Sequence, residues 1–330
     1  MSEEVDTLFI STNFFGYSRE IQRQLEKRGR RVAAFGDRPA TDSLSKVLIR
    51  LAPELMRAKA EAYFDAIIAQ VKGQPIKDVL MIKGETLSPA TIRRMRAIFP
   101  RACFTLYFWD SYRNLPKDSR EKVALSDRVF SFDPHDAAAD GRMTYRPLFY
   151  LDEYAKLREA PQDIDVLFFG TVHSDRYAVL QRIERVLPKD LRWKKVLYCP
   201  TRWIYAARSV AMPALLWVDK SDLIFSPKSK DEVTALIARS RIVIDIDHPG
   251  QSGYTMRMIE VLGAGRKLIT TSTEVANADF FNPANIAVVD RKKPEVSNVF
   301  LKARYEPPPP EILRRYSLDG WLDEVLPDRR

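Results

Sequence analysis

The sequence predicts an α/β protein with two Rossmann-like domains, a cleft between them and a C-terminal helix that crosses back onto the first domain. Three observations predict this fold. The chain has 330 residues, which suits two domains better than one. Short apolar runs alternate with amphipathic helical stretches, as in parallel sheets covered by helices on both faces. Four prolines at 307–310 end this alternation before a last helical stretch at 311–326.

The first half of the chain shows the alternation clearly. Strands are expected at 6–12, 31–35, 78–82, 103–108 and 127–132, and helices at 18–28, 43–71 and 88–99. Ser88 followed by Pro89 is a typical helix start, because serine caps the first turn and proline fits inside it. This half predicts the first domain, residues 1–155.

The second half repeats the pattern after a polar segment, 147–161, which we expect to link the domains. Strands are expected at 164–169, 193–198, 242–246, 267–271 and 285–289, and helices at 174–187, 231–239 and 256–262. The sequence therefore predicts a second domain at 156–305 and a crossover helix within 306–330.

Composition and charge narrow the class of protein. The net charge of +9 and the pI near 9.4 favour anionic partners. The basic residues are dispersed and no nucleic-acid-binding motif is present, so nucleic acid is not expected as a partner. Cys103 and Cys199 lie far apart in apolar runs, which indicates reduced thiols. No signal-peptide layout and no long apolar run occurs, so we expect a cytoplasmic protein, at most peripheral to a membrane.

The most informative stretch is 245–271, where an apolar run leads into a glycine-bearing loop and then a helix. Ligands of open α/β sheets bind beyond the carboxyl ends of the strands, so this loop is the expected binding site. The amides of Gly253, Tyr254 and Thr255, at the positive end of the helix, suit a diphosphate. Arg257, one turn further on, would add charge-assisted hydrogen bonds, although a surface position explains it equally well.

The segment 253–271 resembles the nucleotide-sugar half of GT-B-fold glycosyltransferases. Residues 168–177 resemble the opening strand and loop of that same half. Three further segments, 83–85, 107–110 and 279–283, resemble a bacterial branch acting in lipopolysaccharide and capsular polysaccharide assembly. The resemblance implies a GT-B fold, a nucleotide-sugar donor, and a cell-surface glycan or lipid-linked acceptor.

The resemblance also implies roles for individual residues. It places Glu260 on the ribose hydroxyls of the nucleotide. Gly170 lies in the loop that opens the donor site, and Arg176 and Lys228 would neutralise the diphosphate leaving group. Such enzymes commonly need no bound metal, so no cofactor and no metal site are expected, and cationic side chains with the helix dipole must stabilise the leaving phosphate.

The catalytic residues are less constrained by the sequence. An inverting enzyme needs a base from the first domain, and Glu85 and Asp110 both directly follow expected strands. A pairing of Glu85 with Lys83, or a helix-capping role for Asp110, explains either residue without catalysis. His173 is the preferred histidine of the site, ahead of the other two. A retaining enzyme would need no such base, and the sequence does not decide between the two.

Two segments bear on membrane contact, and three other functions stay open. Segments 46–59 and 203–218 are apolar and basic, and each would suit an anionic membrane surface or would simply pack on its own sheet. The alternatives are a GT-B epimerase, a transferase that uses a cytidine monophosphate sugar, and a non-enzymatic anion-binding scaffold. A NAD enzyme is disfavoured, because no GxGxxG follows the first strand.

Overall fold

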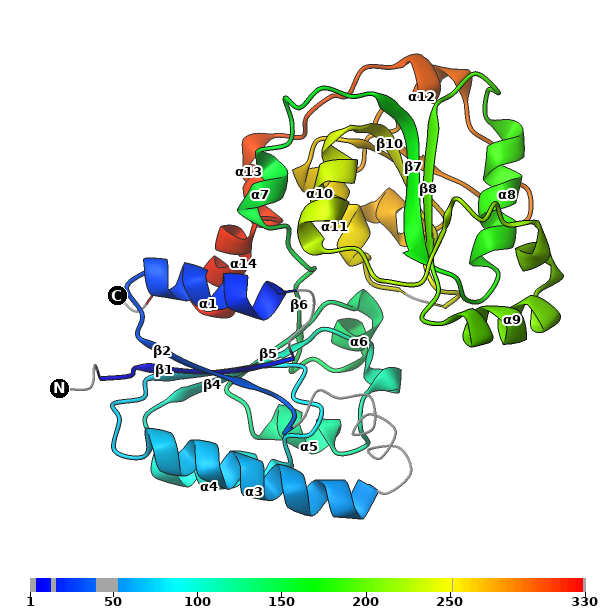
Figure 1. Ribbon diagram of the computed structural model, residues 1–330. Coiled ribbons are helices and arrows are strands. Elements are labelled where there is room, and N and C mark those ends of the chain that lie inside the picture. The colour runs from blue at the N-terminus through cyan, green and yellow to red at the C-terminus, as the bar shows by residue number, and fades with distance from the viewer. Residues whose placement is uncertain (1–3, 13–15, 40–52, 251, 329–330) are drawn as a thin grey trace. The chain divides into compact units, whose positions relative to one another are not determined.

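The computed structural model describes residues 4–12, 16–39, 53–250 and 252–328, with only the backbone described for 53–56. Its contacts divide the chain into a first unit, Met1–Pro147 with Leu318–Arg330, and a second unit, Leu148–Ser317. Each unit contains a parallel sheet of six strands in its described part, covered by helices (Figure 1). The predicted fold class is confirmed. The sequence predicts domain limits at 155/156 and 305/306, whereas the division by contacts falls at 147/148 and 317/318. The limits of the domains as folding units stay a prediction.

The first unit has the strand order β2-β1-β3-β4-β5-β6, with all neighbours parallel. Its elements are β1 (Thr7–Ser11), α1 (Tyr17–Lys27), β2 (Val32–Gly36), α3 (Pro53–Val71), β3 (Asp78–Ile82), α4 (Pro89–Ile98), β4 (Cys103–Phe108), η1 (Tyr112–Asn114), α5 (Ser119–Ala124), β5 (Arg128–Ser131), α6 (Pro134–Ala139), β6 (Thr144–Tyr145) and α14 (Leu318–Val325). Ser88 caps α4 as expected, accepting a hydrogen bond from the Thr91 amide at 3.1 Å.

The two faces of the first sheet are covered by different helices. One face packs against α3, α4 and α5, through alternate strand residues such as Val79 and Met81. The other face lies under α1 and α14 (Figure 1). The ring of Trp321, fully buried on α14, meets the ring of Tyr107 edge-on at 4.8 Å. The end of the chain therefore crosses back onto the first sheet, as expected.

The second unit has the order β12-β11-β10-β7-β8-β9, again parallel throughout. Its elements are α7 (Asp152–Ala155), β7 (Ile164–Thr171), α8 (Arg176–Val186), β8 (Trp193–Tyr198), α9 (Arg202–Ala211), η2 (Pro213–Trp217), β9 (Leu223–Ile224), α10 (Lys230–Ala238), β10 (Ser240–Asp245), α11 (Met256–Gly263), β11 (Lys267–Thr270), η3 (Thr273–Asn277), β12 (Ile286–Val288), α12 (Asn298–Lys302) and α13 (Pro310–Arg315).

Helices again cover both faces of the second sheet. The face formed by residues such as Val166, Ile242 and Ile244 packs on α8, η2 and α12. Helices α10 and α11 lie over the opposite face (Figure 1). The strongly apolar strands follow from this burial on both faces.

Some sequence predictions need correction. The single terminal helix expected at 311–326 is two helices, α13 and α14, which belong to different units. The expected linker 147–161 contains α7, which packs against α11 of the second unit.

Several predicted features fall outside the described residues. These are residues 43–52 of the second expected helix, residues 46–52 of the basic segment 46–59, the loop residues 13–15 after the first strand, and Gln251. No helix in the described part of the chain has the length and apolar character needed to span a membrane.

Candidate donor site at the carboxyl edge of the second sheet

Both sheets have a point where the order of strand addition reverses. In the first sheet, β2 and β3 lie on opposite sides of β1, and in the second sheet β8 and β10 lie on opposite sides of β7. Loops leaving the two central strands at such a point diverge to opposite faces and leave a crevice at the carboxyl edge, where ligands of α/β proteins bind. In the second sheet this point brings together the end of β7 and the end of β10.

The loop after β10 is anchored at the start of α11. Thr255 is the N-cap residue, and its Oγ1 accepts a hydrogen bond from the Met258 amide at 3.1 Å. The same hydroxyl donates to Oδ2 of Asp245, the last residue of β10, at 2.6 Å. Burial raises the pKa of the Asp245 carboxyl, while Arg257, the Thr255 hydroxyl and Arg176 act in the opposite direction. The N-terminus of α11 is therefore fixed beside the end of its own strand.

Two arginines cross the junction between β7 and β10 in opposite directions. Arg257, on the helix after β10, donates from Nη1 to the carbonyl oxygen of Phe169 in β7 at 2.7 Å. Arg176, on the helix after β7, donates from Nε to the carbonyl oxygen of Ile246 beyond β10 at 2.9 Å. Each loop thus sends a guanidinium group to the other strand. The two cations lie at the place where the crevice is expected.

The guanidinium group of Arg257 is the more enclosed of the two. Its Cζ lies 3.0 Å from the centroid of the Phe169 ring, and Nε lies 3.6 Å from Oε2 of Glu260. The Nε–H group is buried and finds no hydrogen-bond acceptor among the described residues, which is rare for an N–H group. Burial lowers the pKa of both Arg257 and Arg176.

Glu260 lies on the second turn of α11 and is almost completely buried. Besides Arg257, it interacts with the hydroxyl of Tyr154, on α7. The pKa of Tyr154 is raised, first by burial and then by the negative charge of Glu260. Glu260 therefore pairs with the guanidinium group of Arg257 and with the hydroxyl group of Tyr154. Its ribose-binding role stays a prediction.

His173 lies two residues beyond β7, as expected for a residue of this edge. Its ring centroid is 6.1 Å from that of His248, in the loop after β10, so both loops contribute a histidine. Burial, followed by the charge of Arg176, lowers the pKa of His173 to about 4. The imidazole is consequently neutral at physiological pH. The next residue, Ser174, has a φ of 48°, a backbone angle that is uncommon for serine.

Arg291, which follows β12, belongs to the same edge and was missed by the sequence analysis. Its Nη1 donates to Oδ1 of Asp247 at 2.9 Å and to Oγ1 of Thr271 at 3.0 Å, and its Nη2 donates to Oδ1 of Asp175 at 2.6 Å. These contacts join the loops after β7, β10, β11 and β12. The rule that ligands bind beyond the carboxyl ends of the strands also selects Arg291 if it is applied to the last strand.

The other predicted donor-site residues have different surroundings. Gly170 lies against Arg176, since a Cβ added there would be 3.4 Å from Nη1 of that side chain. Gly253 and Tyr254 are buried, and the Tyr254 ring meets Phe280 edge-on at 5.4 Å. Lys228 forms an ion pair with Glu232 at 2.7 Å, in the loop after the edge strand β9, which β8 separates from β7.

In the first unit, Glu85 and Asp110 are both held by Lys83. The Lys83 Nζ lies 2.6 Å from Oδ2 of Asp110 and 3.5 Å from Oε2 of Glu85, and Arg38 also pairs with Glu85. The pairing of Glu85 with Lys83, which the sequence left open as an alternative to catalysis, is present. Asp110 does not cap a helix, because Ser111 holds the N-cap position of η1. A catalytic role for either carboxylate stays a prediction.

The turn that carries Glu85 is supported from inside the first unit. Lys122, almost fully buried on α5, donates to the Gly84 carbonyl oxygen at 3.0 Å, and burial lowers its pKa. Asp37, buried beyond β2, accepts from the Glu85 amide at 3.2 Å and from Oγ1 of Thr12 at 2.7 Å. Lys83 itself has a φ of 67°. The sequence analysis missed these supports, which come from distant segments.

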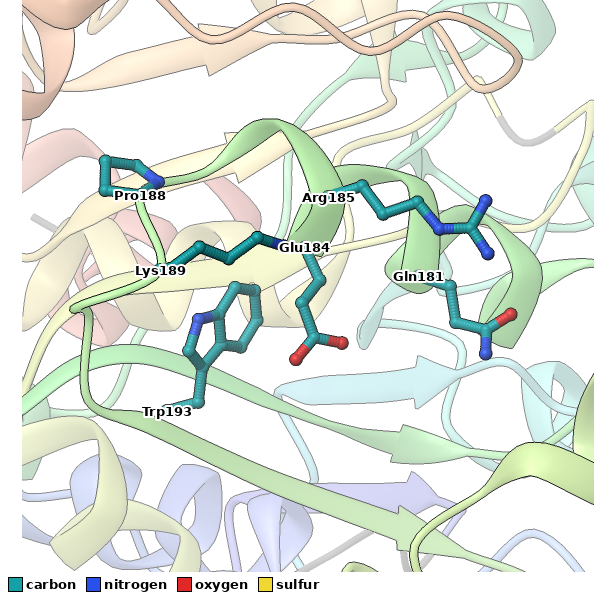
Figure 2. A pocket seen from close by; sticks show the side chains of 6 residues that line it. All are labelled: Gln181, Glu184, Arg185, Pro188, Lys189 and Trp193. Atoms are coloured by element: carbon teal, nitrogen blue, oxygen red, sulfur yellow. The ribbon is translucent and has the colours of Figure 1, made fainter.

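A shallow hollow of about 240 Å³ lies elsewhere on the second unit (Figure 2). It is lined by Gln181, Glu184, Arg185, Pro188, Lys189 and Trp193. Gln181, Glu184 and Arg185 lie in the second half of α8, Pro188 and Lys189 follow its end, and Trp193 begins β8. The hollow is therefore at the amino edge of the sheet, opposite the candidate site. Within the described residues, no three His, Cys, Asp or Glu side chains are grouped as a set of metal ligands.

Solved structures resemble the chain over nearly its whole length. A glycosyltransferase from Rickettsia africae aligns with a TM-score of 0.61, 12% identity and coverage of 98% of this chain and 100% of that one. Anabaena Alr3699/HepE, solved with UDP and glucose, aligns with a TM-score of 0.61, 11% identity and coverage of 98% and 100%. The fold is GT-B.

A third solved structure with this fold has a different chemistry. A UDP-N-acetylglucosamine 2-epimerase aligns with a TM-score of 0.54 and 11% identity, over 99% of this chain and 98% of that one. No family model and no curated protein matches the sequence. The similarity to GT-B proteins therefore establishes the fold, and any inference about function must come from the residues of the site.

Proposed function

We propose that this protein is a glycosyltransferase whose nucleotide-sugar donor binds at the carboxyl edge of the second sheet. The observation that carries the proposal is the pair of arginines, Arg176 and Arg257, that crosses the junction between β7 and β10. The acceptor is a cell-surface glycan or a lipid-linked glycan. No metal takes part in the transfer.

The arginine pair suits a diphosphate for a specific reason. Both guanidinium groups donate to neutral carbonyl oxygens, and the Nε–H of Arg257 finds no acceptor in the described part of the chain. A diphosphate would offer charged acceptors instead, and such hydrogen bonds are about twice as strong as neutral ones. The first-turn amides of α11 lack intrahelical acceptors and would add further donors.

The same groups would serve the chemical step. When the glycosidic bond to the donor phosphate breaks, negative charge grows on the leaving diphosphate. Fixed cations and a helix N-terminus stabilise that charge without rearranging at the moment of reaction. Glu260, next to Arg257, would accept hydrogen bonds from the ribose hydroxyls. Asp110 and Glu85 are the candidate bases for the acceptor hydroxyl.

The test is turnover of donor sugars. The chain is incubated with a panel of nucleotide sugars, including cytidine monophosphate donors, together with a bacterial glycolipid extract, and nucleotide release is measured with and without EDTA. We expect release of a nucleoside diphosphate that is insensitive to EDTA and about tenfold to a hundredfold slower in Arg176→Gln, the loss typical of a charged hydrogen bond. Arg185→Gln, at the other end of the same helix, is the matched control and should leave the rate unchanged. Equal rates in the two variants would contradict the proposed site.

The fold similarity to a 2-epimerase supports a second candidate function. An epimerase would convert the nucleotide sugar to its epimer without releasing the nucleotide and without needing an acceptor. Chromatography of the donor pool after incubation separates the two reactions. Epimer without free nucleotide would support the second candidate, and free nucleotide with glycosylated acceptor supports the transferase.

A further inference from the structure

Helix α9 and the turn η2 turn their polar groups inward. Oγ of Ser209 donates to the Tyr205 carbonyl oxygen, and the Tyr205 hydroxyl donates to the carbonyl oxygen of Leu215 at 2.5 Å. Arg208 donates to the carbonyl oxygen of Val172, beyond β7. Tyr205, Arg208 and Ser209 are the side chains of α9 that are at least partly buried. Tyr205 therefore joins α9 to η2, and Arg208 attaches the helix to the loop after β7.

The opposite face of this segment is apolar and exposed. The exposed fractions are 87% for Trp203, 86% for Val210, 70% for Leu216 and 80% for Trp217. Of the seven large apolar residues that are exposed in the described part of the chain, five lie between 203 and 217. Single exposed apolar residues are ordinary on a protein surface, but a concentration of them marks an interaction site.

Cationic side chains outnumber anionic ones around this surface. Between residues 192 and 220 the sequence holds six lysines and arginines and one aspartate, Asp219. Two of the six, Arg192 and Lys195, pair with Asp165 and Glu184. Arg202, exposed at the start of α9, and Lys220, exposed just beyond η2, flank the apolar side chains. Tryptophan and cationic side chains together are typical of surfaces that lie in the headgroup region of an anionic bilayer.

We propose that the exposed face of α9 and η2, formed by Trp203, Val210, Leu216 and Trp217 with Arg202 and Lys220, docks on an anionic lipid bilayer. The apolar side chains enter the boundary between headgroups and acyl chains, and the two cations pair with lipid phosphates. The surface belongs to the second unit and shares no residue with the arginine pair. This inference is therefore independent of the proposed transferase activity.

The experiment is sedimentation of the full-length chain with sucrose-loaded vesicles. The wild type should bind vesicles of phosphatidylglycerol mixed with phosphatidylcholine more tightly than vesicles of phosphatidylcholine alone. Trp203→Gln with Trp217→Gln should lower the partition coefficient about tenfold or more, because binding scales with the apolar area inserted. Arg202→Gln and Lys220→Gln should each lower it about fivefold on the anionic vesicles only.

A control variant and a measurement of oligomeric state make the test specific to this face and to lipid. Val299→Gln removes an apolar side chain of similar exposure on α12 and should leave vesicle binding unchanged. Failure of the wild type to bind anionic vesicles, or equal binding by the double tryptophan variant, would overturn the proposal. So would a wild-type dimer that the double variant abolishes, because the face would then bind a second copy. Nucleotide release should stay at the wild-type rate in every one of these variants.

Discussion

At the scale of single residues, the candidate site depends on which atoms its cations contact. Arg176 donates to the carbonyl oxygen of Ile246 and Arg257 to that of Phe169, so each guanidinium group is held in place. Carboxylates also lie nearby, because Arg257 pairs with Glu260 at 3.6 Å and the negative charge of Asp245 opposes the lowering of the pKa of both arginines by burial. Cations fixed in this way are prepared for an anion and need little rearrangement to bind one.

The ribose-binding role of Glu260 can be tested by comparing nucleotides with and without the 2′-hydroxyl group of the ribose. If its carboxylate accepts hydrogen bonds from the ribose, the wild type should bind a ribonucleoside diphosphate about tenfold more tightly than the 2′-deoxy form. Glu260→Gln should bind the two forms with nearly equal affinity. Calorimetry with both nucleotides measures the ratio. A ratio unchanged by the substitution, with a lowered free energy of unfolding, would instead mean that Glu260 only pairs with Arg257 and Tyr154.

His173 offers a test of the electrostatics around Arg176. Its pKa is lowered to about 4, against about 6.5 for an unperturbed histidine. NMR titration should therefore show a neutral ring down to roughly pH 5, with the resonance assigned by its loss in His173→Gln. Between these two pKa values the unfolded chain binds the proton more readily, so stability should fall as the pH falls through this interval. A midpoint near the unperturbed value would contradict the burial of this ring beside Arg176.

At the scale of elements, α11 is fixed at both ends and along its side. Thr255 ties its start to Asp245, and Gly265, with a φ of 62°, turns the chain out of its last turn. Packing requires a glycine at position 263, because a Cβ there would overlap the ring of Tyr150. That ring is held in turn by a hydrogen bond from its hydroxyl to the Leu313 carbonyl oxygen at 2.8 Å. The helix that carries Arg257 therefore has little freedom to shift.

Gly263→Ala should be destabilising despite the higher helix propensity of alanine. Overlap with a buried and hydrogen-bonded ring should cost about 1–3 kcal/mol of the free energy of unfolding. Gly141→Ala is the matched control, since that site has open space around it and an ordinary φ. Denaturant unfolding followed by circular dichroism measures both variants. Equal stability of the two would show that Tyr150 moves aside freely.

The elements that sequence reasoning predicted share one property. Strands such as β3 and β4 are largely apolar runs, and their limits were predicted to the residue. The missed helices α5, α6 and α7 are too short for a clear period of 3.6 residues. For the segment 203–218 the sequence left two readings open, contact with an anionic membrane or packing on its own sheet, and the exposed apolar side chains of α9 and η2 do not pack on the sheet.

At the scale of the whole molecule, the fold was predictable and the site only partly so. Alternating strands and helices predict parallel sheets, and the rule for carboxyl edges selects the loops after β7 and β10. The rule does not predict that Arg176 and Arg257 reach across to each other's strands, which depends on strand order. Asp37 and Arg291 follow β2 and β12, strands to which this rule was not applied, and Lys122 was missed because it reaches the edge of the first sheet from α5.

The central claim is that Arg176 and Arg257 bind the phosphates of a nucleotide donor. The most direct measurement is calorimetric titration of nucleoside diphosphates into the wild type and into Arg176→Gln, Arg257→Gln and the control Arg185→Gln. We expect one nucleoside diphosphate to bind the wild type and Arg185→Gln equally, and to bind each of the other two variants about tenfold to a hundredfold more weakly. Unchanged affinity in folded Arg176→Gln and Arg257→Gln, or no binding of any nucleotide by the wild type, would contradict it.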